Sequence, residues 1–143
     1  MTSEFRQAMD KDFASQLTRK NMEPYYKELG IVWDQRLFNS NWGEFENYEI
    51  LVNSAPVGVL RLSHDHLSYY IRDLQVDRRW QCKGLGEKAI EYSVEIARHA
   101  EVELLRLRVF CISPAVSLYE RMGFKIRKTE DGMHFMEREV FSK

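Results

Sequence analysis

One stretch, residues 69–100, constrains the fold of this chain most, because it combines a strand, a glycine loop and a helix. It opens with apolar residues that favour β-structure: Ile71, Leu74 and Val76. A polar segment, residues 77–83, then leads to Gly84 and Gly86. Beyond them, residues at three- and four-residue steps form the inward stripe of an amphipathic helix: Leu85, Ala89, Ser93, Ile96, Ala97 and Ala100. The stretch therefore predicts a glycine loop at the N-terminus of a helix.

A loop in this position can bind an anion. The first N–H groups of a helix have no partner inside it and carry the positive end of the helix dipole. Gly84 and Gly86 have no side chain that would keep a ligand from these groups, and Arg78, Arg79 and Lys83 add positive charge nearby. A phosphate group is the simplest ligand. The alternative is a tight turn whose glycines only ease packing of strand against helix, and the glycines alone do not decide.

Two motifs narrow the choice. The Q-x-x-G-x-G at residues 81–86 resembles the acyl-CoA pyrophosphate loop of the GNAT family of N-acetyltransferases, and residues 74–77 resemble the strand before it. Residues 113–124 resemble the last helix of that family, N-x-A-x-x-L-Y-E-x-x-G-F. The resemblance covers residues 57–143 in the family's order, with a helix and a strand between the motifs. This combination is far more specific than the glycine loop alone.

A dinucleotide-binding fold is excluded, although Gly84, Gly86 and Ala89 also satisfy its G-x-G-x-x-A pattern. That fold requires an acidic residue about twenty positions further on, at the end of the next strand. Here the strand predicted at residues 104–109 ends in segment 110–112, which has no carboxylate. The residues that follow are also too few for the remaining units of a doubly wound sheet.

The composition bounds the class of protein. With 143 residues, 44% of them hydrophobic and 30% charged, the chain is expected to form one globular domain, residues 1–143. The net charge of −1 argues against a nucleic-acid partner held by bulk electrostatics. No apolar run is long enough to span a membrane, and residues 1–20 are too polar for a signal peptide. We therefore expect a cytoplasmic protein without a membrane partner.

No metal site is predicted. Cys82 and Cys111 lack the neighbouring ligands of a zinc site and are expected to be free thiols. His64 and His66 form an H-x-H without an evident third ligand, and a solvated turn is the expected environment.

The whole chain predicts an α/β (α+β) fold built on one sheet. β-prone runs between turn signals predict strands at residues 4–8, 48–53, 57–63, 68–76, 104–109, 124–127 and 133–141. One helix is expected from Asp10 or Lys11 to about Lys20, and a second begins with a first turn that holds Pro24 and ends at Gly30. Two more are expected at residues 34–38 and 85–100. The last helix has Ser113 as its N-cap and Pro114 as its first residue, and it ends at Gly123. The expected sheet is mixed, mostly antiparallel, of six or seven strands, with helices on both faces.

The resemblance implies a GNAT fold and the transfer of an acetyl group from acetyl-CoA to a primary amine by direct attack. Loop amides would neutralise the pyrophosphate, and the preceding strand would pair with the pantetheine arm and polarise the thioester. The residues so assigned to acetyl-CoA are Leu74, Gln75, Val76, Gln81, Cys82, Lys83, Gly84, Leu85, Gly86 and Ser113. Ser113 stands where the family often has asparagine. Tyr119 resembles the tyrosine that protonates the departing thiolate, and a core tyrosine is the alternative.

The residues expected to contact the amine acceptor are Tyr25, Trp33, Tyr70 and Arg72. Tyr25 and Trp33 belong to an aromatic-rich region that lies beside the acceptor cleft in the family, with core packing as the alternative. Tyr70 occupies the position of a glutamate base used by some members and cannot act as a base at neutral pH. Arg72 shares its face by strand parity and would favour an acceptor that carries a carboxylate.

The general base stays open: Glu44, Glu46 or Asp73 acting through water, or an amine that arrives neutral. Two function classes remain, an N-acetyltransferase and a non-catalytic acyl-CoA-binding regulatory or interaction module of the same fold. Tyr119 favours the enzyme, and thiol release from acetyl-CoA with a panel of amines distinguishes the two. The sequence does not name the acceptor or decide between a monomer and a homodimer.

Overall fold

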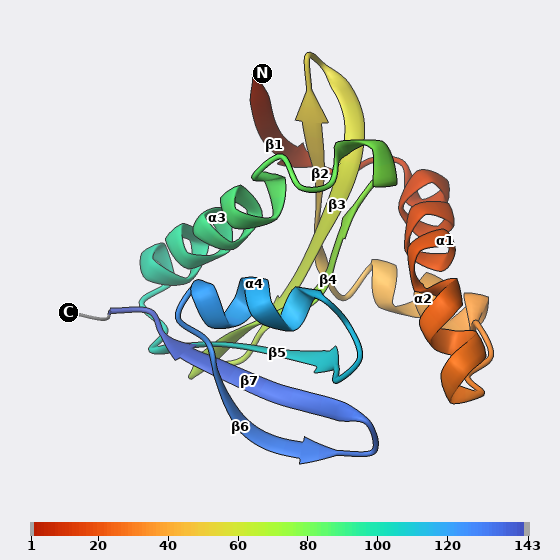
Figure 1. Cartoon of the computed structure of the whole chain (residues 1–143). Coiled ribbons are helices and arrows are strands. Elements are labelled where there is room, and N and C mark those ends of the chain that lie inside the picture. Colours follow the sequence, from red (N-terminus) through yellow and green to blue (C-terminus); the bar gives the residue numbers. More distant parts are fainter. Residues whose placement is uncertain (1, 142–143) are drawn as a thin grey trace. The chain divides into compact units, whose positions relative to one another are not determined.

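The computed structural model describes residues 2–141 of the chain (Figure 1). Seven strands are present in this part: β1 (Ser3–Gln7), β2 (Glu46–Val52), β3 (Ala55–His64), β4 (Ser68–Val76), β5 (Leu104–Phe110), β6 (Lys125–Glu130) and β7 (Met133–Glu139). The same residues form four α-helices and one short 3-10 helix: α1 (Lys11–Leu29), α2 (Gln35–Trp42), α3 (Leu85–His99), α4 (Ala115–Arg121) and η1 (Arg78–Trp80). Every predicted strand is present, and η1 is the one element that was not expected.

The strands form one sheet in the order β1-β2-β3-β4-β5-β7-β6. β4 and β5 pair in parallel, as a strand–helix–strand unit requires, and the pairs β1–β2, β5–β7 and β6–β7 are antiparallel. Asp131 and Gly132 close the β6–β7 hairpin with φ values of 52° and 77°, the positive values of a tight two-residue turn. The predicted α+β fold with a mixed, mostly antiparallel sheet is confirmed.

Contacts divide the chain into two compact units, and the first consists of the residues up to Arg61 together with Asp73–Leu85. In this unit α1 lies against α2. Its core holds Ala14, Leu17, Phe38 and Val59, with Phe13, Trp33 and Trp42 packed against it. The Trp33 and Phe38 rings lie 5.7 Å apart, and the Phe38 and Trp42 rings 6.2 Å apart, between centroids. These aromatic side chains therefore pack with the core.

The second unit consists of Leu62–Arg72 and the residues from Gly86 on. Of the predicted inward stripe of α3, Ala89, Ser93 and Ala97 are buried and Ile96 is half-buried, whereas Ala100 lies beyond the helix and is exposed. Ile90 and Val94, which the stripe did not include, are buried as well. α4 lies against β5, as Figure 1 shows. β6 is an edge strand whose residues are all exposed, and its charged side chains disfavour pairing with another chain.

The N-terminal helical region corrects one prediction. α1 runs without a break from Lys11 to Leu29 with Pro24 inside it, so Pro24 does not start a second helix. A proline has a helical φ, and the chain can continue past it, although the missing hydrogen bond costs about 3 kcal/mol in a helix interior. The helix begins and ends where the sequence predicted. The structure adds that Asp10 caps its start by accepting the Phe13 N–H and that Gly30 ends it at φ 69°.

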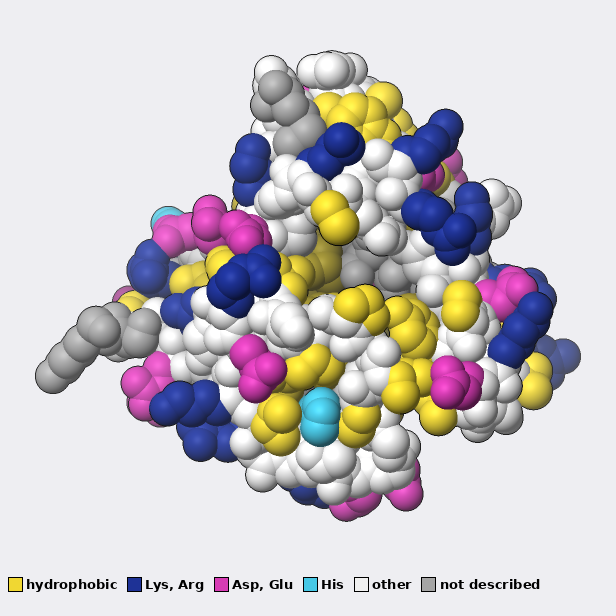
Figure 2. Space-filling view, in the orientation of Figure 1, with side chains coloured by type: hydrophobic (Ala, Val, Ile, Leu, Met, Phe, Trp, Pro, Cys, Tyr) yellow, Lys and Arg dark blue, Asp and Glu magenta, His cyan; other side chains and the backbone are white. Residues whose placement is uncertain are grey.

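The other boundaries differ little from expectation, except that α2 runs on to Trp42. Whether residues 1–143 form one domain stays a prediction. None of the helices within residues 2–141 combines the length and apolarity needed to cross a membrane. Acidic and basic side chains are interspersed on the face shown in Figure 2, in keeping with the net charge of −1.

Candidate functional site

The loop between β4 and α3 is closed by hydrogen bonds of its own side chains. Asp77 Oδ1 accepts the backbone N–H of Arg79 at 3.0 Å, and this bond is the main reason why the pKa of Asp77 is lowered. Gln81 Nε2 donates to the Val76 carbonyl at 2.9 Å. The glutamine of the Q-x-x-G-x-G motif therefore ties the loop to the end of the strand.

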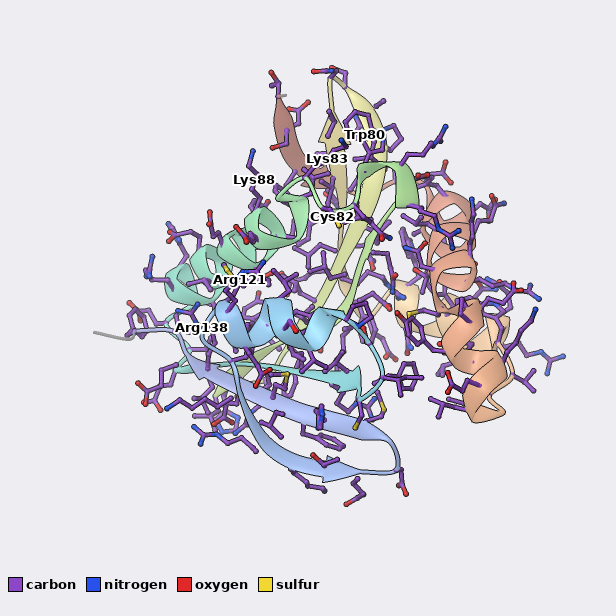
Figure 3. The ribbon with its side chains drawn as sticks, in the orientation of Figure 1. Trp80, Cys82, Lys83, Lys88, Arg121 and Arg138 are labelled. Atoms are coloured by element: carbon purple, nitrogen blue, oxygen red, sulfur yellow. The ribbon has the colours of Figure 1, made fainter. Side chains whose placement is uncertain are left out.

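The next segment is an exposed loop that leads into α3. Residues 81–84 are exposed, residues 81–82 form a turn, and the N–H groups of Cys82 and Gly84 donate no backbone hydrogen bond within residues 2–141. α3 begins directly afterwards, so the positive end of its dipole lies at the same place. The basic side chains of the loop are exposed: Arg78, Arg79 and Lys83. Basic side chains gather over this loop in Figure 2, and Figure 3 labels Cys82 and Lys83 within it. The loop has the features of an anion site.

The two loop glycines differ in what they do. Gly84 has φ 83°, and a Cβ placed on it would meet nothing within 4 Å. A side chain there would strain the backbone and occupy the open space beside the loop. Gly86 has no such φ, and its Cβ would lie 2.9 Å from Leu118 Cδ2 of α4. Gly86 thus serves packing of helix against helix, while Gly84 keeps the loop open.

The last residues of β4 belong to a well-fixed strand. The ladder of β4 with β5 ends at Ile71, whereas β4 continues to Val76. Asn21 Nδ2 donates to the Val76 carbonyl at 3.0 Å and to Gln75 Oε1 at 3.2 Å. Gln75 is buried, and Leu74 is half-buried. The predicted pantetheine-binding residues are therefore held in place from α1.

An ion pair in the first unit was missed by sequence reasoning. The Arg61 side chain on β3 is 2% exposed, and its Nη1 donates to Asp73 Oδ2 at 3.0 Å. Its Nε donates to Asn47 Oδ1 at 2.9 Å, and its Cζ lies 4.1 Å from the centre of the Phe38 ring. Burial raises the pKa of Asp73 and lowers that of Arg61, against the effect of the opposite charge. The sequence did hold a signal for this pair, because the apolar run V-G-V-L-R-L contains one arginine. An arginine buried in such a strand needs an acidic partner.

Tyr119 lies in α4 of the second unit. Its side chain is buried, with 7% of the residue exposed, and its ring meets that of Phe124 edge-on at 5.6 Å between centroids. The packed ring is what a core tyrosine would show, and it also fixes the position of the hydroxyl. The role of that hydroxyl stays a prediction.

Ser113 makes the hydrogen bond expected of an N-cap, although Pro114 and not Ser113 occupies the N-cap position of α4. The Ser113 Oγ accepts the Ala115 N–H at 3.1 Å, and Pro114 already has the helical dihedrals φ −65° and ψ −14°, although the helix itself begins at Ala115. A hydroxyl that accepts one hydrogen bond can still donate another. Ser113 therefore keeps one donor for a ligand.

Tyr70 and Arg72 lie together, as strand parity predicted. The Tyr70 hydroxyl donates to Asp65 Oδ2 at 3.1 Å and accepts from Arg106 Nη1 at 3.3 Å. The Cζ of Arg72 lies 4.7 Å from the centre of the Tyr70 ring. Asp65 also accepts the N–H groups of the turn after β3, which lowers its pKa and orders the H-x-H segment.

The two aromatic residues predicted to contact the acceptor lie in the first unit. Trp33 stacks on Tyr26 at 6.3 Å between ring centroids, and its Nε1 donates to Gln35 Oε1 at 2.9 Å. Tyr25 is half-buried on α1. Trp33 is thus part of the core packing, and contact of either residue with an acceptor stays a prediction.

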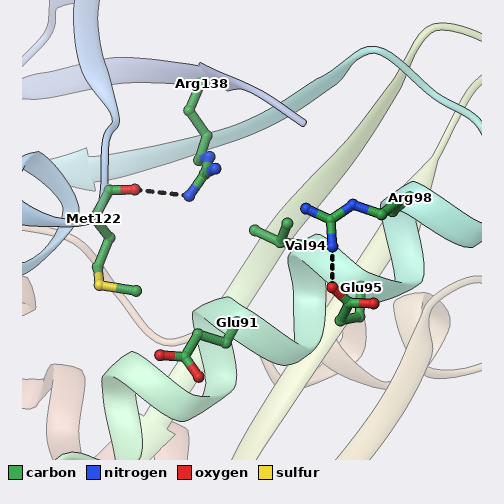
Figure 4. Close-up of a pocket in the computed structure, with 6 residues that line it drawn as sticks. All are labelled: Glu91, Val94, Glu95, Arg98, Met122 and Arg138. Carbon is green, nitrogen blue, oxygen red and sulfur yellow. Dashed lines mark hydrogen bonds and ion pairs between the residues drawn. The ribbon is translucent and has the colours of Figure 1, made fainter. Parts of the chain in front are cut away.

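A pocket of about 350 Å³ lies elsewhere, in the second unit (Figure 4). It is lined by Glu91, Val94, Glu95, Arg98, Met122 and Arg138. Arg138 Nη1 donates to the Met122 carbonyl at 2.9 Å, and Arg98 pairs with Glu95. None of the predicted site residues lines this pocket. In residues 2–141, no cluster of three or more His, Cys, Asp or Glu side chains could hold a metal ion.

Comparison with known proteins identifies the family to which these features belong. The model of the acetyltransferase (GNAT) family matches residues 6–124. Among curated proteins none is similar enough in sequence to count as a match.

Solved structures match nearly the whole chain. PaiA N-acetyltransferase of Thermoplasma acidophilum, in complex with coenzyme A, is 16% identical with a TM-score of 0.78, over 97% of this chain and 99% of that one. The ribosomal-protein-S18-alanine N-acetyltransferase of Escherichia coli is 18% identical with a TM-score of 0.75, over 99% and 96%. A GNAT family acetyltransferase of Elizabethkingia anophelis with acetyl-CoA bound is 16% identical with a TM-score of 0.78, over 96% and 97%. At these identities the likeness shows the fold.

Proposed function

The chain belongs to the GNAT family and is an acetyl-CoA-dependent N-acetyltransferase, and from this premise we propose that it acetylates a primary amine by direct attack, with Tyr119 as proton donor. The observation that carries the proposal is the exposed loop at residues 81–84, with Gly84 at φ 83°, directly ahead of α3. Two of the similar structures hold coenzyme A or acetyl-CoA, which supports a cosubstrate of this kind. Family membership favours the enzyme over a non-catalytic binding module.

The proposed reaction forms a bond from the amine nitrogen to the acetyl carbonyl carbon and breaks the carbon–sulfur bond. The N–H groups of the loop and the dipole of α3 hold the pyrophosphate. The backbone of Leu74, Gln75 and Val76 pairs with the pantetheine arm, and an N–H near Val76 stabilises the charge on the carbonyl oxygen. Tyr119 gives its proton to the departing thiolate, and the proton lost by the amine restores it through the base and solvent. The products are the amide and free CoA.

The choice of general base is aided by the environment of Asp73. Burial raises the pKa of Asp73, the direction that suits a base working near neutral pH. Arg61 holds its carboxylate in place, and 22% of the Asp73 side chain is exposed. Glu44 is exposed and Glu46 is half-buried on β2. Among the three carboxylates we therefore favour Asp73.

The experiment that tests the proposed function is thiol release from acetyl-CoA in the presence of a panel of primary amines. We expect at least one amine to raise the rate well above the rate with acetyl-CoA alone. A folded protein that binds acetyl-CoA and releases thiol with none of the amines would contradict the proposal. That result would favour the alternative function, a non-catalytic acyl-CoA-binding module.

Gly84 offers a test of the loop. Gly84→Asn should leave the melting temperature close to that of the wild type, because asparagine tolerates a positive φ better than most residues. It should raise the Kd for acetyl-CoA by about tenfold or more, since the added side chain occupies the open space beside the loop amides. Calorimetry measures the Kd. Gly43→Asn is the matched control, because a Cβ there also meets nothing within 4 Å.

The comparison with Gly84→Val separates strain from blocking. Valine at φ 83° should also lower stability, by about 1–2 kcal/mol. If only Gly84→Val binds acetyl-CoA weakly, the glycine serves the backbone conformation. Unchanged binding of acetyl-CoA in both variants would contradict the proposal that this loop binds the pyrophosphate.

A further inference from the structure

Arg72 and Arg108 lie side by side on an exposed face of the sheet in the second unit. Along β5, Leu105, Leu107 and Val109 are buried on one side, and Arg106 and Arg108 alternate with them on the other. The last pair of the β4–β5 ladder is Ile71 with Leu107, so Arg72 and Arg108 follow directly on the two neighbouring strands. Both arginines are exposed to solvent.

Each guanidinium is held over an aromatic ring. The Cζ of Arg72 lies 4.7 Å from the centre of the Tyr70 ring, and its Nε donates to Ser63 Oγ at 2.7 Å. The Cζ of Arg108 lies 5.9 Å from the centre of the Phe135 ring, its cross-strand partner on β7. Contact with a ring face restrains an arginine side chain without consuming its hydrogen-bond donors. The ring contacts therefore restrain both guanidinium groups.

The charges of this pair add. After burial, the neighbouring Arg108 is the largest cause of the lowered pKa of Arg72. On the same face, Arg106 and Arg127 are paired with Glu137 at 2.7 Å and 3.4 Å. Arg108 takes part in no ion pair within the described residues. An anion bound beside both guanidinium groups would relieve their repulsion.

We propose that Arg72 and Arg108 bind a carboxylate of the amine acceptor, so that the enzyme acts on amines that carry an acidic group. The proposal rests on the function proposed above and names its substrate class. The ring of Tyr70 lies against Arg72, and both residues were predicted to contact the acceptor. A guanidinium fork matches a carboxylate through two parallel hydrogen bonds.

The kinetic test compares acceptors that differ only in the acid. Glycine, β-alanine and γ-aminobutyrate are each assayed against the corresponding amide. Arg108→Gln should raise the KM for the acids by about tenfold or more, because it removes a charge-assisted hydrogen bond to the carboxylate. It should leave the KM for the amides unchanged. Arg108→Lys keeps the charge but not the fork, and its KM for the acids should lie between those of Arg108→Gln and the wild type.

Arg127→Gln is the matched control, because it removes the same charge from the same face at a residue already paired with Glu137. It should leave every KM unchanged. An increase equal to that of Arg108→Gln would overturn the proposal and indicate a diffuse basic surface for an acidic partner. Equal increases for acids and amides in Arg108→Gln would overturn it as well.

Calorimetry with glutarate keeps this inference separate from the proposed function, because binding requires no acetyl transfer. The wild type and Arg127→Gln should bind glutarate with the same affinity, and Arg72→Gln and Arg108→Gln should each bind about tenfold or more weakly. Acetyl transfer by a wild-type protein that does not bind glutarate at millimolar concentration would overturn the inference alone. Glutarate binding without acetyl transfer to any amine would support the subsite while contradicting the proposed function.

Discussion

Tyr119→Phe should lower kcat for acetyl transfer by about 10²- to 10⁴-fold, the usual effect of losing a positioned proton donor. The KM for acetyl-CoA should change little, because the hydroxyl acts chiefly in the transition state. The ring of Tyr119 is buried against Phe124 and stays in place when the hydroxyl is removed. The free energy of unfolding should therefore be close to that of the wild type.

Two further measurements make the test of Tyr119 specific. The loss should be smaller with acyl donors whose thiol is more acidic, because such a thiolate leaves without a proton. Tyr92→Phe serves as the control, since Tyr92 is a half-buried tyrosine of the same unit outside the predicted site. It should keep the wild-type kcat. A Tyr119→Phe enzyme with wild-type kcat would make Tyr119 a core residue only.

Arg61→Ala should lower the free energy of unfolding by about 3–5 kcal/mol, because it leaves the Asp73 charge without its partner in a mostly buried place. The same change removes the bond to Asn47 and the contact with the Phe38 ring. A loss of this size is a large part of the 5–15 kcal/mol typical of folded domains. Urea unfolding of the wild type and variant measures it.

A surface ion pair gives the matched control for Arg61. Lys27 pairs with Glu23 at 3.1 Å, with side chains 76% and 56% exposed, and Lys27→Ala should change the free energy of unfolding by no more than about 0.5 kcal/mol. Replacing both charges, as in Arg61→Met with Asp73→Leu, should restore much of the stability. If the free energy of unfolding of Arg61→Ala lies within about 1 kcal/mol of the wild-type value, the ion pair does not stabilise the unit as we infer.

Features written in a local stretch of sequence were predicted well. The start of α1 at Asp10 or Lys11 and its end at Gly30 were predicted, because each boundary depends only on the residues of the neighbouring turn. The glycine loop and α3 were recognised for the same reason, since the change of hydrophobic period lies within one stretch. Pro24 misled because proline favours the first turn of a helix, whereas here the helix continues past it despite the lost hydrogen bond.

Features that join distant residues could not be read from the chain. The Arg61–Asp73 pair connects β3 with β4, and the contact of Arg108 with Phe135 depends on the register of β5 with β7. Register is a property of the assembled sheet. The need for Gly86 likewise became clear only when Leu118 of α4 was placed beside it.

Direct transfer of the acetyl group is tested most plainly by following a labelled acetyl group through one turnover. Acetyl-CoA labelled in its acetyl group is mixed with excess protein and the best amine of the panel, and mass spectrometry is applied to the small molecules and to the intact chain. We predict that all the label appears in the amide, with one free CoA for each amide and none of the label on the protein. Label retained on the chain, for example on Cys82 or Cys111, would contradict direct attack, and acetyl-CoA that binds but stays intact would contradict catalysis.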